Sequence, residues 1–204
     1  MTSTQTSPRA ASQVAGQKFV VVGLGASGLA AAKLLLARGA DVVLNDHRSE
    51  VAGADPLCAR GATTAFGHHD DAVFADADHV VLSPGVAPLP ALARAADRGL
   101  PIASEIELAS WFIDAPILAI TGTNGKSTVT SLLGEMMQAS GRPCFVGGNL
   151  GTPLTTVVGT PAAEVEGLVA VELSSFQLEH VSRFRAHVAT LLNVTDDLLD
   201  RYEF

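Results

Sequence analysis

The sequence predicts an α/β protein built from two successive parallel-sheet units, the first of them Rossmann-like. Two motifs carry this prediction. A short β-rich run at residues 18–22 leads into Gly23-Leu-Gly-Ala-Ser-Gly28, and an apolar run at residues 117–121 leads into Gly122-Thr-Asn-Gly-Lys-Ser127. In both places a strand passes through a glycine-rich turn into a helical pattern, an arrangement typical of nucleotide sites. The apolar residues are mostly Ala, Val and Leu, which suits helices packed on a parallel sheet.

Length and charge bound the class of protein. The chain has 204 residues, enough for one large or two small domains. Its net charge of −8 and the lack of a basic run argue against binding to nucleic acid. No apolar run reaches membrane-spanning length, and the polar first residues lack the apolar core of a signal peptide, so we expect no membrane partner. Cys58 and Cys144 are expected to be two buried thiols in a reducing, cytoplasmic compartment.

The first unit is expected to span residues 17–113, after a flexible tail at residues 1–16. Its elements are predicted from the spacing of apolar residues and from the glycine and proline residues that separate them. Ser104 and Glu107 have the spacing of a capping box, which would open the last helix of the unit. The predicted strands are residues 18–22, 41–46 and 79–82, and the predicted helices are residues 29–38, 89–98 and 105–111.

The second unit is expected to span residues 114–204 and to be a phosphate-loop type of ATPase domain, incomplete at its carboxyl end. The boundary is placed near Asp114-Ala-Pro116, because the phosphate loop has to start a fresh strand–helix unit. A helix that closes within residues 136–141 is expected after the loop. Buried strands are predicted at residues 143–146, 168–173 and 188–193, and a helix is expected to start at residues 177–179.

The loop at residues 122–128 predicts a site for the phosphates of ATP. Its glycines let backbone N–H groups approach phosphate oxygens, and the helix that follows adds positive potential at its N-terminus. Lys126 can reach the β- and γ-phosphates, and the Ser127 hydroxyl suits Mg²⁺. The strict Walker spacing would place glycine at position 120, where this chain has Ile120, so the loop is a shortened variant. The predicted ATP-binding residues are Gly122, Thr123, Asn124, Gly125, Lys126, Ser127 and Thr128.

The first glycine motif also predicts a nucleotide site. Asp46 lies about twenty residues past the glycines, where a dinucleotide-binding fold places the acid that binds a ribose. The residues alone leave open whether the ligand is NAD. The turn Ser83-Pro-Gly85 follows a predicted strand at the same carboxyl edge of the sheet.

Several stretches resemble the Mur ligases, which build the peptide of bacterial cell-wall precursors. They are the phosphate loop with its preceding Thr121, then Gly147-Gly-Asn-Leu-Gly151, Val171-Glu-Leu-Ser-Ser-Phe-Gln-Leu-Glu179 and Leu192-Asn-Val-Thr-Asp-Asp197. In this order they resemble the D-glutamate-adding branch of the family, over the chain from about Lys18 to Phe204. The resemblance implies an ADP-forming ligase that uses ATP and Mg²⁺ to join D-glutamate to UDP-N-acetylmuramoyl-L-alanine through an acyl phosphate, in peptidoglycan synthesis.

The resemblance also implies roles for individual residues. Ala26, Ser27, Asp46, His47 and Arg48 would line the uracil pocket, with Ser83, Pro84 and Gly85 near the diphosphate and Asn149 and Ser174 on the rest of the substrate. Glu172 would bind Mg²⁺ together with Ser127, and with Lys126 it is a predicted catalytic residue. Independently, a charge at the end of an apolar strand is costly without a partner such as a metal ion. The alternatives are a solvated cation for Arg48, ordinary turns around Pro84 and Asn149, and a water-facing carboxylate for Glu172.

Four features depart from the family pattern or from a simple motif. His47 stands where a smaller polar residue is expected, and Leu198 stands where the family has a histidine that helps hold a second metal ion. Family members continue well beyond Phe204, so this chain is expected not to turn over alone and to expose apolar faces that favour self-association. His68-His69-Asp70 is interpreted as a surface loop, because adjacent histidines rarely share a metal ion.

Other interpretations stay open from the sequence. One is a Mur-type ligase that adds a different amino acid. A second is a non-catalytic nucleotide-binding module, which the first glycine motif allows to be NAD-dependent and which the second loop with Glu172 disfavours. A third is an interaction fragment without activity.

Overall fold

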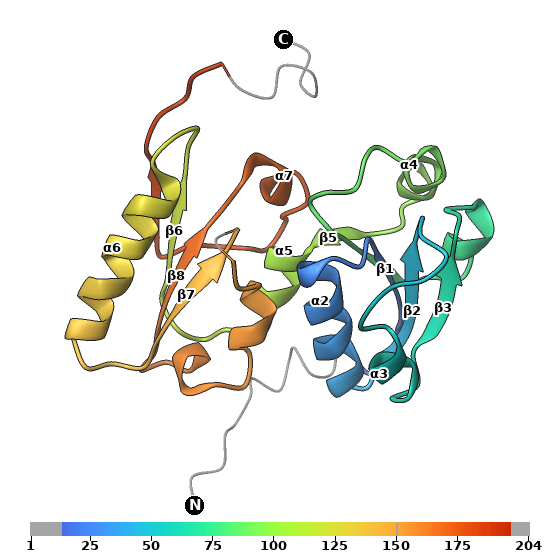
Figure 1. Ribbon diagram of the computed structural model, residues 1–204, viewed down its shortest axis with the longest axis horizontal. Helices are drawn as coiled ribbons and strands as arrows, with labels where there is room; N and C mark the ends of the chain where they lie inside the picture. The colour runs from blue at the N-terminus through green and yellow to red at the C-terminus, as the bar shows by residue number, and fades with distance from the viewer. Residues whose placement is uncertain (1–13, 150, 197–204) are drawn as a thin grey trace, which may run out of the picture.

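Figure 1 shows two sheets side by side, in a computed structural model that describes residues 14–149 and 151–196. The first sheet has the order β3-β2-β1-β4-β5 and the second the order β7-β8-β6-β9, and all paired neighbours run parallel. Parallel sheets of this kind bind ligands outside the carboxyl ends of their strands, where the strand order reverses. The prediction of two parallel-sheet α/β units is confirmed.

The first unit contains five strands and the helices between them. Its strands are β1 Lys18–Val22, β2 Asp41–Asp46, β3 Thr63–Phe66, β4 His79–Leu82 and β5 Ile102–Ser104. Its helical elements are α2 Ala26–Ala37, α3 Asp55–Cys58, the 3-10 turn η1 Asp71–Phe74, α4 Pro90–Asp97 and α5 Glu105–Ser110.

The second unit contains the remaining four strands. They are β6 Ile117–Thr121, β7 Cys144–Gly148, β8 Leu168–Glu172 and β9 Val188–Leu191. Its helical elements are α6 Lys126–Ala139, the 3-10 turns η2 Leu154–Val157 and η3 Pro161–Ala163, and α7 Ser175–Leu178.

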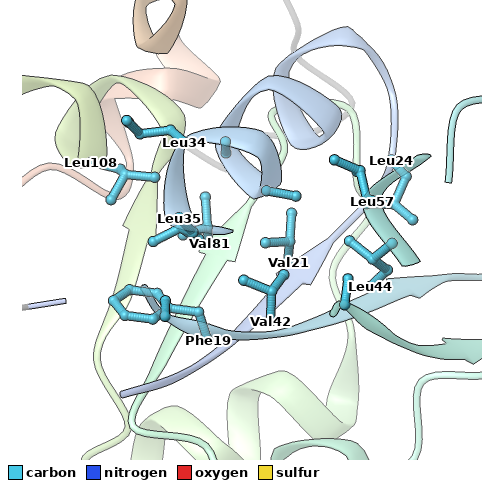
Figure 2. Packing of buried hydrophobic residues seen from close by; sticks show 14 of the residues in the cluster. Phe19, Val21, Leu24, Leu34, Leu35, Val42, Leu44, Leu57, Val81 and Leu108 are labelled. Carbon is cyan, nitrogen blue, oxygen red and sulfur yellow. The ribbon is translucent and has the colours of Figure 1, made fainter. Parts of the chain in front are cut away.

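Side-chain alternation along β1 builds a core on each face of the first sheet. Phe19 and Val21 pack toward α2, as Figure 2 shows, while Val20 and Val22 pack against the α4 side. All four are fully buried, as expected for the central strand of a parallel sheet covered on both faces. The helix is therefore fixed against the strand whose end carries the first glycine motif.

Helix α5 belongs to both cores. Ile106 and Ala109 pack into the core of the second sheet, whereas Leu108 packs into that of the first. Ser104 caps the helix by accepting a hydrogen bond from the Glu107 amide at 3.2 Å. The predicted capping box is only half formed, because the Glu107 carboxylate turns to other partners instead of returning to Ser104. The helix ends at Ser110, one residue earlier than predicted.

The Glu107 carboxylate joins the two units. It is 1% exposed and accepts hydrogen bonds from the Trp111 indole at 2.9 Å and from the amides of Ser182, Arg183 and Phe184 at 2.8–3.0 Å. Burial raises the pKa of Glu107, but these donors outweigh it and hold the pKa below its ordinary value. The carboxylate therefore stays charged and fixes residues 182–184 against α5.

The neighbouring Glu105 is expected to make the protein less stable as pH rises, because its pKa is shifted in the opposite direction to that of Glu107. It is 1% exposed, and burial raises its pKa from 4.5 to about 7, although the Thr155 amide donates to one oxygen. A raised folded-state pKa contributes stability that is present below pH 4.5 and is lost as pH rises through about 7. The loss should be roughly 3 kcal/mol. In urea titrations at pH 5 and pH 8, Glu105→Gln should remove this component, and an unchanged pH difference in that variant would contradict the assignment.

Some predictions about elements were incomplete or wrong. Strands β3 and β5 were not predicted. Strand β9 was predicted to be buried but lies at the sheet edge, with Val188 54% and Leu191 62% exposed. The two cysteines are partly buried and form no disulfide. Within residues 14–149 and 151–196, no helix combines the length and apolar character needed to cross a membrane.

Candidate functional site

The phosphate loop connects β6 to α6 through two glycines with positive φ angles. Gly125 caps the helix at φ 87°, and Gly122 has φ 136°. A Cβ at Gly122 would lie 3.0 Å from the Asn193 carbonyl oxygen, so both the conformation and the space there require glycine. The first amides of the 14-residue helix α6 have no acceptor within the helix and are available to an anion.

Lys126 lies folded over the loop. Its Nζ donates to the carbonyl oxygens of Gly122 at 2.7 Å and Thr123 at 3.0 Å. The ammonium group is thus held at the loop that leads into α6. Ser127 and Thr128 lie in the first turn of this helix. A cation and free helix amides in one place provide the electrostatics that phosphate oxygens need.

Glu172, Ser127 and Asn149 come together from three elements. Glu172 ends β8 and is 2% exposed. Its Oε2 accepts from the Ser127 hydroxyl and its Oε1 from the Asn149 amide group, both at 2.8 Å. The water-facing alternative for Glu172 is therefore wrong. A carboxylate and a hydroxyl oxygen at the edge of the loop are hard donors that fit Mg²⁺, with positions left over for phosphate oxygens and water.

Ser174, which was predicted to contact the substrate, has a local structural role. Ser174 caps α7 in a capping box with Gln177, whose side chain accepts from the Ser174 amide at 3.0 Å. Among the described residues, no group of three or more His, Cys, Asp and Glu side chains is arranged to hold a metal ion. Leu198, where the family has histidine, lies outside the described residues.

A second feature, a cavity of about 560 Å³, opens at the carboxyl ends of β1, β2 and β4. All eight side chains and turn residues predicted for the uridine diphosphate end of the substrate line it. They are Ala26, Ser27, Asp46, His47, Arg48, Ser83, Pro84 and Gly85.

Asp46 and Arg48, which both line this cavity, form an ion pair. Asp46 is 2% exposed; it accepts from Arg48 Nη2 at 2.7 Å, from Arg48 Nε at 2.8 Å and from the Leu24 amide at 2.8 Å. The hydrogen bond from the Arg48 side chain, followed by the backbone donors, outweighs burial and holds the pKa of Asp46 well below its ordinary value. Arg48 is accordingly a fixed cation of the cavity wall. Both Asp46 oxygens already have donors, which leaves this acid poorly placed to take a ribose.

Glycine is required where β1 turns into α2. A Cβ at Gly28 would lie 2.0 Å from the Gly23 carbonyl oxygen, which also accepts the Ser83 hydroxyl at 2.6 Å. Ser83 thus ties the end of β4 to the first glycine loop. The turn at residues 83–85 is therefore part of the site as well as a chain reversal.

His69 was missed by the sequence interpretation, which placed residues 68–70 in a surface loop. The His69 ring is partly buried, lines the cavity, and its Nδ1 lies 2.6 Å from Asn45 Oδ1. Burial, with the nearby His47, lowers its pKa, so the ring is a neutral hydrogen-bonding group. Only the placement of β3 beside β2 brings it there, and no local sequence signal marks it.

Comparison with known proteins matches both halves of the chain. Residues 17–104 match the model of the N-terminal domain of MurD-like Mur ligases, and residues 120–203 match that of the Mur ligase middle domain. The chain belongs to the Mur ligase family. This Mur ligase chain is 48% identical over 190 residues to the UDP-N-acetylmuramoylalanine–D-glutamate ligase of Desulfosudis oleivorans, covering 91% of the chain and 41% of that relative. It is 52% identical over 198 residues to the enzyme of the same name from Anaeromyxobacter dehalogenans, covering 95% and 42%.

Solved structures support the fold of this Mur ligase chain. A UDP-N-acetylmuramate:L-alanyl-gamma-D-glutamyl-meso-diaminopimelate ligase from Neisseria meningitides superposes with a TM-score of 0.60 at 20% identity, over 93% of this chain and 64% of that one. A murein peptide ligase from Psychrobacter arcticus does so with a TM-score of 0.54 at 22% identity, over 91% and 44%. The chain spans about two fifths of the length of the curated relatives described above.

Proposed function

We propose that this chain carries the UDP-substrate site and the ATP site of an ADP-forming ligase that adds D-glutamate to UDP-N-acetylmuramoyl-L-alanine. The observation that carries the proposal is the hydrogen bond of 2.8 Å between Ser127 and Glu172 beside the phosphate loop. The neighbouring unit carries the cavity that Arg48 lines. The two relatives described above bear the name of this activity, which supports D-glutamate over other amino acids.

The proposed reaction is a phosphoryl transfer followed by an acyl transfer. A carboxylate oxygen of the substrate's alanine attacks the γ-phosphorus of ATP, and ADP leaves. The D-glutamate nitrogen then attacks the resulting carbonyl, phosphate leaves, and the nitrogen loses a proton to give the amide. Mg²⁺, held by Ser127 and Glu172, would neutralise phosphate charge; Lys126 would hold the β- and γ-phosphates, so that catalysis is mainly positioning and charge neutralisation.

The chain's own residues would position the two substrates. Arg48, held by Asp46, offers a planar cation to the uracil base, and the turn at residues 83–85 lies where the diphosphate would emerge from the cavity. A small pocket at the seam between the units is lined by Ser83, Pro84 and Phe176 of α7. Ser174, at the start of α7, and Asn149 would meet the part of the substrate beyond the diphosphate.

The proposal is tested by titrating this chain calorimetrically with UDP-N-acetylmuramoyl-L-alanine, UDP and NAD. The two uridine ligands should bind and NAD should not, because both Asp46 oxygens are already engaged. Arg48→Ala should weaken the uridine ligands about tenfold, since a single cation–π contact or charge-assisted hydrogen bond is worth about 1–2 kcal/mol. Arg60→Ala, an exposed arginine outside this cavity, is the matched control. Binding of NAD alone would contradict the proposal.

A further inference from the structure

The segment after β9 is bonded to the phosphate loop through residues 192–195. It runs along β6 to the loop (Figure 1), and the Leu192 amide donates to the Thr121 carbonyl at 3.0 Å, which extends the β6–β9 pairing past the strand end. Asn193 follows immediately. Its backbone lies against Gly122, at the position where any Cβ would collide.

The Asn193 side chain bonds to the backbone of the loop as a neighbouring strand would. Its Oδ1 accepts from the Asn124 amide at 2.9 Å, and its Nδ2 donates to the Asn124 carbonyl at 3.0 Å. Its own carbonyl accepts the Thr123 amide at 3.0 Å. Asn193 therefore satisfies both backbone polar groups of Asn124 and the backbone amide of Thr123, in a loop that has no regular structure of its own.

Thr195 completes this contact. Its amide donates to the Thr123 hydroxyl at 3.1 Å, and that hydroxyl donates back to the Thr195 carbonyl at 3.3 Å. Val194, between the two, is 77% exposed and is not among the residues that contact the loop through these bonds. The loop is thus held by the side chain and carbonyl of Asn193 and by the backbone of Thr195.

We propose that Asn193 is a positioning residue for ATP: it holds residues 123–124 so that the amides of residues 125–128 and the Lys126 ammonium face the phosphates. The inference rests on the proposed function and deepens it. Because the amides of Thr123 and Asn124 are bound to Asn193, the phosphate contacts fall to the next four amides, at the start of α6. Asn193 acts through the loop and makes no contact with phosphate in this account.

This proposal changes the roles predicted for two residues of the phosphate loop. Thr123 and Asn124 were predicted to bind ATP directly, as part of the glycine-rich loop. In our proposal these two residues shape the loop, while Gly125, Lys126, Ser127 and Thr128 make the contacts. Removing the side-chain amide group of Asn193 would release the backbone of Asn124. The uridine cavity lies on the other sheet and should be unaffected.

The test compares Asn193→Ala with Val194→Ala in this chain. Asn193→Ala should weaken Mg²⁺–ATP about tenfold, the loss expected for about two neutral hydrogen bonds, and should leave the affinity for UDP-N-acetylmuramoyl-L-alanine unchanged. Hydrogen exchange of the Asn124 amide, measured without nucleotide, should become at least tenfold faster. Val194→Ala should change neither quantity.

Each other outcome overturns the inference in a recognisable way. If the unsubstituted chain binds Mg²⁺–ATP and Asn193→Ala binds it equally well, the positioning role alone is overturned. Unchanged exchange at Asn124 has the same consequence and needs no nucleotide. If Asn193→Ala also loses the uridine ligand, the residue serves the fold in general. If the unsubstituted chain does not bind Mg²⁺–ATP, the proposed function fails together with the inference.

Discussion

Replacing Glu107 with alanine is expected to lower the free energy of unfolding by about 3 kcal/mol, a large part of the 5–15 kcal/mol typical of such domains. The substitution leaves the Trp111 indole and the amides of residues 182–184 without their acceptor. Each unpaired buried donor costs about 1–3 kcal/mol, less where water can reach it. Because these donors lie in both units, the loss should also loosen the second sheet against α5.

Urea denaturation followed by tryptophan fluorescence measures this effect directly, since Trp111 is the protein's single tryptophan and donates to Glu107. Glu135→Ala is the matched control, because Glu135 is an exposed glutamate on helix α6. The control should change stability by less than about 0.5 kcal/mol. A Glu107→Ala chain as stable as the control would show that the contact between the units contributes little.

Replacing Lys126 with alanine is expected to weaken Mg²⁺–ATP binding by about a hundredfold. The ammonium group sits over the loop on the carbonyls of Gly122 and Thr123, and phosphate oxygens would exchange for these acceptors. Two charge-assisted contacts to phosphate are together worth about 3 kcal/mol, which corresponds to this factor.

Binding of UDP-N-acetylmuramoyl-L-alanine by the same variant reports whether the chain stays folded, since that cavity lies on the other sheet. Lys33→Ala, which removes an exposed lysine from α2, controls for the change in net charge. ATP affinity within about threefold of the unsubstituted chain in Lys126→Ala would mean that this loop does not hold the phosphates.

The elements with strong local signals were predictable from the sequence. Strands β1, β2 and β4 have the predicted bounds, and both glycine turns join strand to helix, because apolar runs and glycine turns act locally. Strand β3 escaped prediction because its four residues, Thr63–Phe66, have a mixed pattern and pair only with β2. The exposure of β9 depends on the neighbours of the strand, which its apolar sequence does not reveal.

The site was predictable where a motif marks it and not where tertiary placement does. Ser127 and Glu172 are 45 residues apart in sequence, yet the ends of β6 and β8 bring them together as adjacent parallel strands do. His69 carries no such signal, and the motif at residues 192–197, although it resembles the family, gave Asn193 no role. Each is an ordinary polar residue whose position follows from a strand pairing, of β3 with β2 and of β9 with β6.

The most direct test of the two-site account is a sequential calorimetric titration. The chain is saturated with UDP-N-acetylmuramoyl-L-alanine and then titrated with Mg²⁺–ATP, and the order is reversed in a second experiment. We expect one site for each ligand and binding of each in the presence of the other, because the Arg48 cavity and the Lys126 loop lie on different sheets. Competition between the two ligands for a single site would contradict it.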